Sequence, residues 1–306
     1  REFMDHWERM STEHHAEHLI LDLRDNPGGY LKEAVNILSQ IIEEEGKLLV
    51  YTEGKNQSRI EYKSTGKVFF PVGNVTVLIN EASASASEII AGCIQDQDRG
   101  LIIGTPTYGK GLVQEQFELS NGGILRMTVS KYYTPSGRSI QKAYDSTSVV
   151  DTSIIFKTTL GRPVHAGGGI VPDIEVKDNI DWEHPAMKQL MDIISEYAIR
   201  YNLEKYDGKL VSLDQVEEVR KQLPAEAEIL AVVTSLAEQK AKPGEISISN
   251  YINEHKDAIL NISEATLVAY RIGEEGWYVE FNNSDPLVSK AREMVRLDLL
   301  LALKAN

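Results

Sequence analysis

The sequence has little cysteine, a deficit of basic residues and no long apolar run. Cys93 is the only cysteine among 306 residues, so there is no disulfide framework, and the redox compartment stays undetermined. The 32 Lys and Arg residues are outnumbered by 46 Asp and Glu residues, and the net charge of −14 argues against nucleic acid as a partner. No apolar run reaches the ~18 residues that would cross a bilayer, so no membrane span is expected.

Histidine is absent between His18 and His165, a stretch that contains the most conspicuous motifs of the chain. A nucleophile in this stretch has no local imidazole to act as its base. Cys93 follows Ser85 by eight residues (93 − 85) on a helical pattern, which indicates a buried structural thiol and not a catalytic one.

The remaining composition is ordinary for a soluble globular protein, with 42% hydrophobic and 25% charged residues. A chain of 306 residues can bury a sizeable core and is expected to form two domains. It opens in Arg1–Trp7, which reads as the middle of an amphipathic helix, and no signal peptide is present. We therefore expect a fragment of a longer protein.

Strand-like and helix-like segments alternate in the first part of the chain, which is typical of α/β architecture. A helix is predicted over 1–16, with Phe3, Trp7 and Met10 on one apolar face. Further helices are predicted over 31–44 and 87–97, and strands over 18–23, 48–52, 59–63, 75–79, 101–103, 113–119 and 124–133. The last two strands are joined by Asn121-Gly122-Gly123, a hairpin signal. After Asp181 the pattern is helical, over 182–201, 213–222, 225–240 and 286–304. Residues 266–282 are an uncertain mix in which Trp277–Phe281 resembles a short strand.

The most informative segment is an alternation of serine and alanine at residues 83–87, directly after the apolar run 75–79. Its middle serine, Ser85, precedes Lys110 by 25 residues (110 − 85), and that lysine lies between two glycines. A serine at a strand-to-helix junction is accessible and has the amides of the helix start beside it. A desolvated lysine can serve as its base. The segment therefore favours Ser/Lys acyl transfer.

Each of these residues also has a plainer interpretation. The serines can cap the helix that follows, and Ser87, with Glu88 behind it, is the better capping candidate. Lys110 can be a solvated loop lysine, because a lysine titrates near ~10.4 and must lose its charge to accept a proton near neutral pH. Burial between apolar walls would lower its pKa. The residues alone leave these alternatives open.

Three blocks in order resemble the C-terminal processing (tail-specific) serine peptidases of family S41. They are Val75–Gln114, Leu19–Gly29 with the sequence LILDLRDNPGG, and a stretch from KYYTPSGRSIQ at Lys131 to GGIVPD ending at Asp173. The resemblance covers residues 1–178 and implies a peptidase domain with a crotonase-like (ClpP-like) α/β core. A mostly helical domain is then expected over 179–306. Residues 142–167 look like an insertion relative to the simplest family pattern.

The resemblance also implies roles for individual residues. Ser85 matches the family nucleophile, Lys110 its general base and Gln114 a glutamine that positions the lysine. Ala82 stands where the family often has glycine. For the oxyanion of the acyl-transfer intermediate, the implied hydrogen-bond donors are the backbone amide of Ala86 and a backbone amide of the Gly28-Gly29 turn.

That glycine turn has an alternative interpretation as a plain strand-to-helix corner, and the sequence does not indicate which of its two glycines would donate. Asp96, on the helix after Ser85, is interpreted as structural support. No cofactor is expected.

A further motif, His14-His15-Ala16-Glu17-His18, fits the H-x-x-E-H pattern of inverted zinc peptidases. Zinc chemistry of that kind needs both histidines on one helix and a further acidic ligand. The motif ends at the start of a strand-like run, so the helix would break inside it. We expect a solvated connector and no metal site.

The leading functional hypothesis is a serine endopeptidase that acts on extended polypeptides near their C-termini. The alternatives are an acyl-CoA hydratase or related crotonase, which would not need the Ser85/Lys110 pair, and a non-catalytic peptide-binding scaffold. Family members usually carry a PDZ domain before the Leu19 block, and none is recognised here. The resemblance implies the bacterial periplasm or cell envelope, and a homo-oligomer is left open.

Overall fold

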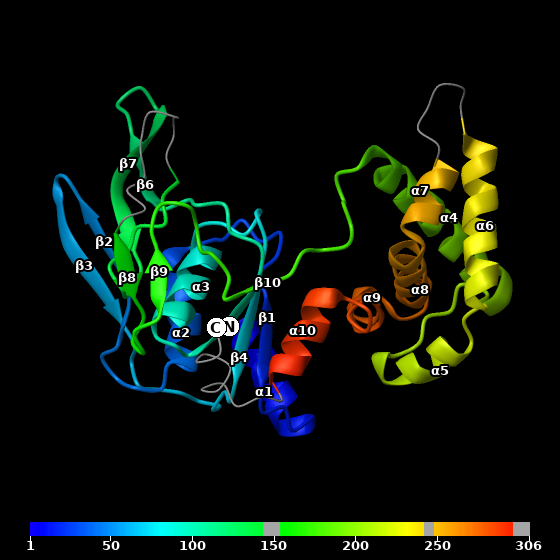
Figure 1. Ribbon diagram of the computed structural model, residues 1–306, viewed down its shortest axis with the longest axis horizontal. Helices are drawn as coiled ribbons and strands as arrows, with labels where there is room; N and C mark the ends of the chain where they lie inside the picture. Colours follow the sequence, from blue (N-terminus) through cyan, green and yellow to red (C-terminus); the bar gives the residue numbers. More distant parts are fainter. Residues whose placement is uncertain (143–153, 242–247, 296–306) are drawn as a thin grey trace. The chain divides into compact units, whose positions relative to one another are not determined.

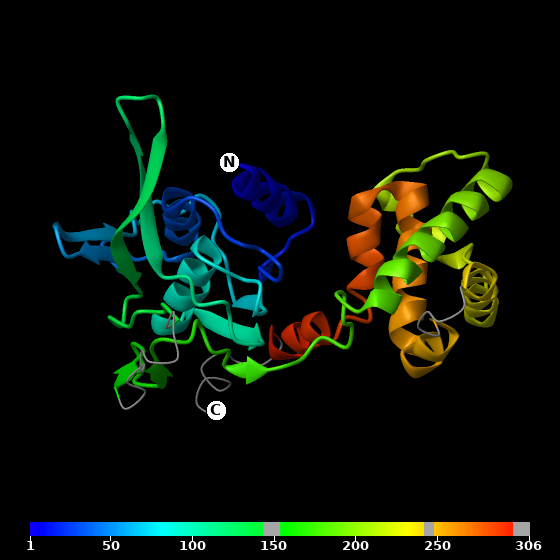
Figure 2. The same cartoon turned by 90° about the horizontal axis from the view of Figure 1, so that it is seen from above.

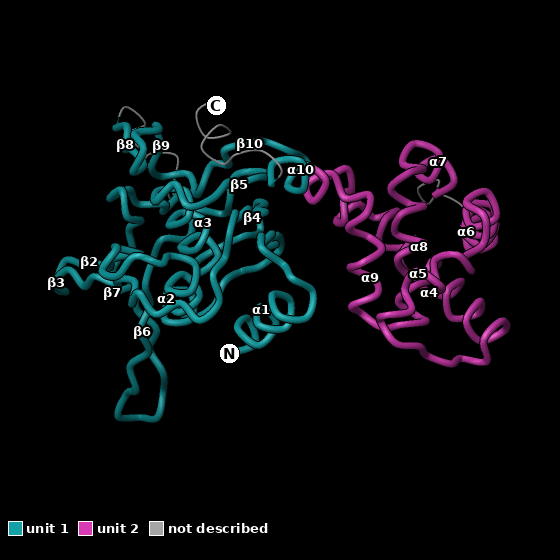
Figure 3. The backbone as a smooth tube through the Cα atoms, turned by 90° about the horizontal axis from the view of Figure 1, so that it is seen from below, with its two compact units in different colours: residues 1–177, 290–306 teal, residues 178–289 magenta. Residues whose placement is uncertain are grey.

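The computed structural model describes residues 1–142, 154–241 and 248–295 (Figure 1). The chain divides into two compact units, which Figure 3 shows in different colours. The first unit contains residues 1–177 with the described residues from 290 onward, and the second contains residues 178–289. The assignment of residues 179–306 to a single domain stays a prediction.

A parallel sheet forms the centre of the first unit, with the strand order β1-β4-β5-β10. All residues of β4 and β5 are buried, as expected for parallel strands covered on both faces. Helix α3 makes the crossover from β4 to β5, so its first residue lies near the carboxyl end of β4. The bounds are β1 Leu19–Asp22, β4 Val75–Ile79, β5 Gly100–Gly104, β10 Ile174–Glu175 and α3 Ala86–Asp96.

A second sheet is antiparallel, with the strand order β3-β2-β7-β6. The predicted hairpin through Asn121–Gly123 joins β6 to β7 and extends away from the rest of the sheet (Figure 2). A register shift in β6 falls between Val113 and Gln114. The bounds are β2 Leu48–Gly54, β3 Gln57–Lys63, β6 Leu112–Glu118 and β7 Ile124–Tyr133.

Helices α2 (Leu31–Ile41) and α3 lie between the two sheets in Figures 1 and 2. Their apolar side chains form one core with the strands, because Leu38, Ile41 and Ile94 have no exposed surface. Helix α1 (Glu2–Glu13) adds Trp7, which is buried as its spacing predicts.

Two details of the first unit differ from the sequence pattern or extend it. Met10 of α1 shares the predicted apolar face but is 42% exposed. Within the predicted insertion, the described residues form a small hairpin of β8 (Ile155–Lys157) and β9 (Pro163–His165). Residues 143–153 of that insertion lie outside the described part of the chain.

The second unit is helical in all of its described regular elements. Its helices are α4 Pro185–Tyr206, α5 Val216–Lys221 after a 3-10 turn at Leu213–Gln215, α6 Glu226–Lys240, α7 Ile248–Glu254, α8 Lys256–Ile272 and α9 Glu274–Phe281. The stretch 266–282, which the sequence left uncertain, is mostly helical, and the strand-like residues 277–281 complete α9. The Trp277 and Phe281 rings stack with centroids 4.4 Å apart, a contact that needs the four-residue spacing of a helix.

The last described element, α10 (Pro286–Val295), covers the first half of the helix predicted over 286–304, and the rest lies outside the described residues. None of the helices in the described ranges is long and apolar enough to cross a membrane. The predicted α/β architecture, followed by a mostly helical region, is confirmed, and its central sheet is parallel.

Candidate active site

Ser85 occupies a strained turn between β4 and α3. It is the N-cap residue of α3, with φ +57° and ψ −115°. A positive φ is uncommon for a residue with a side chain, and sharp strand-to-helix turns of this kind expose nucleophilic serines in other enzymes. Ser85 is half-buried, so part of its surface remains accessible.

The two neighbouring serines are turned into the protein. Ser83 is fully buried and donates its hydroxyl to the Leu23 carbonyl at 2.7 Å. Ser87 is 2% exposed and donates to the Asn26 carbonyl at 3.1 Å. The prediction that Ser87 caps the helix is wrong, because α3 already begins at Ala86 and the cap position belongs to Ser85. Ser85 is therefore the accessible serine of the three.

The Gly28-Gly29 turn lies directly against the Ser85 backbone. Gly28 has φ +88°, and a Cβ placed on it would lie 2.4 Å from the Ala84 carbonyl oxygen and 2.6 Å from the Ala86 nitrogen. No side chain fits this position, so the close approach requires glycine. The structure thus brings Gly28, Ser85 and Ala86 together from segments that are far apart in the sequence.

Two amides near Ser85 are available as donors. In the described chain, the amides of residues 82–85 and 87–89 have acceptors, whereas the Ala86 N–H has none. The Gly28 N–H is engaged, because it donates to Asn26 Oδ1 at 2.9 Å. The Gly29 N–H has no acceptor among the described residues, and the space beside its Cα is open. The geometry therefore favours Gly29 over Gly28 as a donor.

Glu88 links the nucleophile turn to the loop that carries Lys110. Its side chain is fully buried, and its carboxylate accepts hydrogen bonds from the Ser85, Gly109 and Lys110 amides, each at 2.8 Å. The Thr107 hydroxyl donates a fourth at 2.6 Å. Four donors explain how a carboxylate is accommodated without exposure to water. The sequence indicated only a capping role for Glu88, because the Lys110 loop lies 21 and 22 residues away.

Lys110 has a fixed backbone and an exposed side chain. Its N–H donates to Glu88 Oε2, and its carbonyl accepts the hydroxyl of Tyr132. The expected burial of the side chain is absent from this structure, because the loop directs it to solvent. Among the described residues no hydrogen bond joins the Ser85 and Lys110 side chains. Gln114, on β6, is also exposed and makes no hydrogen bond to Lys110 in the described chain.

Tyr132 is a site residue that sequence reasoning missed. It lies on β7, is 3% exposed, and its hydroxyl donates to the Lys110 carbonyl. Burial raises the pKa of this phenol well above its ordinary value, the Glu88 charge adds to the rise, and the polar side chain of Ser85 opposes it. The side chain therefore stays protonated over the working pH range of ordinary enzymes.

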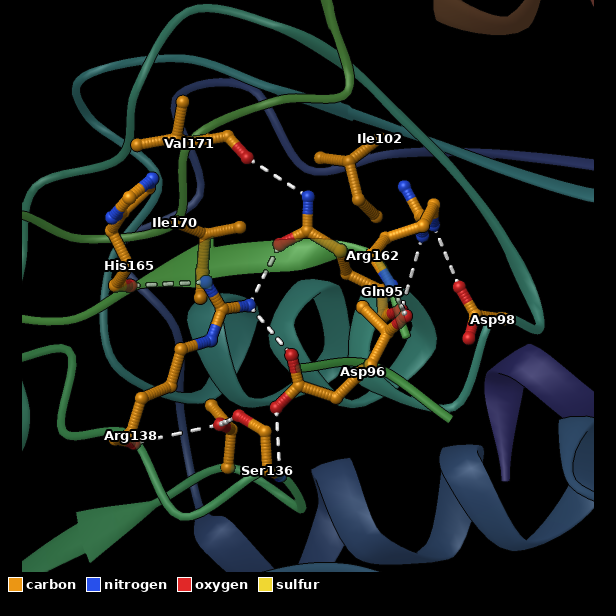
Figure 4. Close-up of polar contacts among 12 residues, drawn as sticks. Gln95, Asp96, Asp98, Ile102, Ser136, Arg138, Arg162, His165, Ile170 and Val171 are labelled. Atoms are coloured by element: carbon orange, nitrogen blue, oxygen red, sulfur yellow. Dashed lines mark hydrogen bonds and ion pairs between the residues drawn. The ribbon is translucent and has the colours of Figure 1, made fainter. Parts of the chain in front are cut away.

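Asp96 lies at the far end of α3 in a separate polar cluster (Figure 4). Its carboxylate accepts the Arg138 guanidinium at 2.8 Å and the Ser136 amide at 3.0 Å. Arg138 is 1% exposed and also donates to Gln95 Oε1 at 2.7 Å. These contacts tie the 131–141 segment to α3 and agree with a structural role for Asp96.

A second arginine continues the cluster on the same end of α3 (Figure 4). Arg162 donates to Asp98 at 2.7 Å and to Asp173 at 2.5 Å. Asp173 in turn accepts the Ile102 amide of β5 at 2.8 Å. The last residue of the third sequence block is therefore held against the parallel sheet.

The histidine motif is divided by the end of a helix. Helix α1 ends at Glu13, and His18 Nδ1 accepts the Asn74 amide at 3.0 Å. The described ranges contain no group of three His, Cys, Asp or Glu side chains arranged to hold a metal ion. Cys93 is buried, and burial raises the pKa of its thiol well above the ordinary range, as expected of an unreactive cysteine.

Known proteins resemble the first unit of this chain. The pattern of Peptidase family S41 matches residues 1–176. A carboxyl-terminal-processing protease of Picosynechococcus sp. is 41% identical over 127 residues, which are 42% of this chain and 30% of that protein. A carboxy-terminal-processing protease of Bartonella bacilliformis is 44% identical over 128 residues, which are 40% of this chain and 28% of that protein.

Among solved structures, the photosystem II D1 C-terminal processing protease is 30% identical, with a TM-score of 0.43 over 54% of this chain and 36% of that one. The matched part of this chain corresponds to less than a third of the length of those two curated relatives. The family pattern nevertheless matches more than half of the present sequence. The chain belongs to peptidase family S41.

Proposed function

We propose that this chain is the catalytic part of a serine endopeptidase of the C-terminal processing type. The observation that carries the proposal is the turn at Ser85, where a partly exposed serine lies beside the Ala86 amide, which has no acceptor among the described residues. Glu88 connects this turn to the backbone of Lys110. The two curated relatives are named as carboxyl-terminal-processing proteases, which supports polypeptides as substrates.

The proposed reaction begins with attack of Ser85 Oγ on the scissile carbonyl carbon. The Oγ–C bond forms as the hydroxyl proton moves to neutral Lys110 Nζ, and the oxyanion accepts hydrogen bonds from the Ala86 and Gly29 amides. The C–N bond then breaks, and Lys110 returns the proton to the leaving amine. A water molecule then attacks the acyl carbon as Lys110 takes one of its protons. The C–Oγ bond breaks, Lys110 returns the proton to Ser85 Oγ, and the carboxylic acid product leaves.

Lys110 must lose its charge for this reaction, although its side chain is exposed in the structure. We propose that the bound polypeptide covers Lys110 and removes water from its side chain, which favours the neutral amine in the complex. Gln114 lies four residues further along the chain (114 − 110), after the register shift in β6, and would orient that amine. The proposed core is crotonase-like, because α3 and the parallel sheet present the nucleophile at a strand-to-helix turn.

The location in a bacterial cell envelope stays a prediction, and a related peptidase of Arabidopsis thaliana is named chloroplastic.

The non-catalytic scaffold and the acyl-CoA enzyme are separated from the peptidase by one experiment. The wild-type protein should react with a fluorophosphonate probe and cleave an extended peptide. Both activities should disappear in Ser85→Ala, and cleavage should disappear in Lys110→Ala. A folded Lys110→Ala protein with near wild-type turnover would remove the lysine from the mechanism.

A further inference from the structure

Tyr132 lies beside the two residues that the proposed mechanism needs. Its hydroxyl donates to the Lys110 carbonyl, and the Ser85 side chain is near enough to this phenol to affect its pKa. Its backbone N–H donates to the Gly111 carbonyl at 3.0 Å. One buried residue of β7 is therefore bonded to the lysine loop, next to the nucleophile turn.

Lys110 is held at both ends of its residue. Glu88 accepts its N–H, and Tyr132 donates to its carbonyl. Both of these side chains are buried, with exposures of 0% for Glu88 and 3% for Tyr132. The exposed lysine side chain can change its rotamer, whereas the position of its Cα relative to Ser85 is determined by these two groups.

We propose that Tyr132 is a positioning residue that sets the place of Lys110 relative to Ser85. The proposal rests on the proposed function of the Ser85/Lys110 site. Tyr132 takes no proton in the reaction, because the buried phenol is neutral. Its hydroxyl acts through hydrogen-bond geometry, on the step in which Ser85 becomes acylated.

The test is Tyr132→Phe, which removes only the hydroxyl, with Tyr133→Phe as the matched control. Tyr133 is the next residue of β7, so its side chain points to the opposite face, where it stacks on Tyr51 with centroids 4.8 Å apart. Each variant is assayed for peptide cleavage and for the second-order rate constant of fluorophosphonate labelling. The labelling rate constant of each variant is divided by its folded fraction, measured in a thermal melt, so the result can be interpreted even if Tyr132→Phe is less stable.

We expect Tyr132→Phe to lower kcat and the labelling rate constant by about tenfold or more, with KM within about twofold of wild type. Tyr133→Phe should match wild type in all three quantities. A Tyr132→Phe labelling rate constant within about twofold of wild type would overturn the positioning role. If Ser85→Ala still reacts at the wild-type rate, the proposed function itself fails, and the inference fails with it.

Discussion

Replacing Glu88 by glutamine tests the connection between the nucleophile turn and the lysine loop. The substitution keeps the shape of the side chain, removes its charge and replaces one acceptor oxygen by a donor group. Oε2 accepts the Ser85 and Lys110 amides, whereas Oε1 accepts the Gly109 amide and the Thr107 hydroxyl. The new amide nitrogen is tolerated better in the place of Oε1, because the Thr107 hydroxyl there can rotate and accept a hydrogen bond from it.

In that arrangement one buried N–H, of Gly109, loses its acceptor, and the remaining bonds lose the assistance of the charge. Together these effects should lower the free energy of unfolding by about 2–4 kcal/mol. Activity should fall further than the folded fraction, because the Ser85 and Lys110 amides share this one carboxylate.

The assay is urea denaturation followed by tryptophan fluorescence. Trp7 is the sole tryptophan of residues 1–177, so Phe at positions 182 and 277 makes the signal report on the first unit. Glu118→Gln, an exposed change on β6, is the matched control and should have no measurable effect. A Glu88→Gln loss below about 0.5 kcal/mol would refute the reasoning from its four hydrogen bonds.

Four further changes have defined outcomes. Gly28→Ala should abolish cleavage and destabilise the first unit by more than ~1 kcal/mol, because its Cβ would overlap the backbone on either side of Ser85; an active variant would contradict this close approach. Lys110→Met should abolish cleavage while the melting temperature stays within about a degree, since the side chain is exposed; a large drop would show that the lysine supports the fold. Arg138→Met leaves the buried Asp96 carboxylate unpaired and should cost about 3–5 kcal/mol in urea denaturation, whereas a neutral result would argue against the ion pair. Burial, followed by the Glu228 charge, raises the pKa of Tyr197 to about 12, above its unfolded value of 10.0. The contribution of this group to stability is therefore full below pH ~10 and is lost as pH rises through ~12. Tyr197→Phe should flatten the fall of melting temperature with pH in alkaline melts, and an unchanged slope would contradict this.

The strand and helix that present Ser85 could be predicted from local sequence. The apolar run 75–79 can only be a buried strand or a short buried helix segment, and the alternating serines and the helical pattern after them mark the junction. The family resemblance also implied that the Gly28-Gly29 turn and Ser85 belong to the same active site. Their actual contact, with Gly28 against the Ser85 backbone, depends on the pairing of β1 with β4.

The contacts of Glu88 and Tyr132 could not be predicted from local sequence. Tyr132 reaches Lys110 across 22 residues, through a sheet whose register no local pattern specifies. The exposure of Lys110 was missed for a related reason, because the requirement for a neutral base says nothing about the protein before its substrate binds. In the second unit, the β-branched and aromatic residues of 277–281 suggested a strand, and packing within the helical unit overrides that preference.

The central claim is that Ser85 forms an acyl-enzyme. The most direct measurement is mass spectrometry of the protein after brief reaction with an activated ester and quenching in acid. The account predicts one added acyl group, on the peptide that contains Ser85, and none in Ser85→Ala. Acylation of a different residue at the same rate, or an equal mass increase in Ser85→Ala, would contradict it.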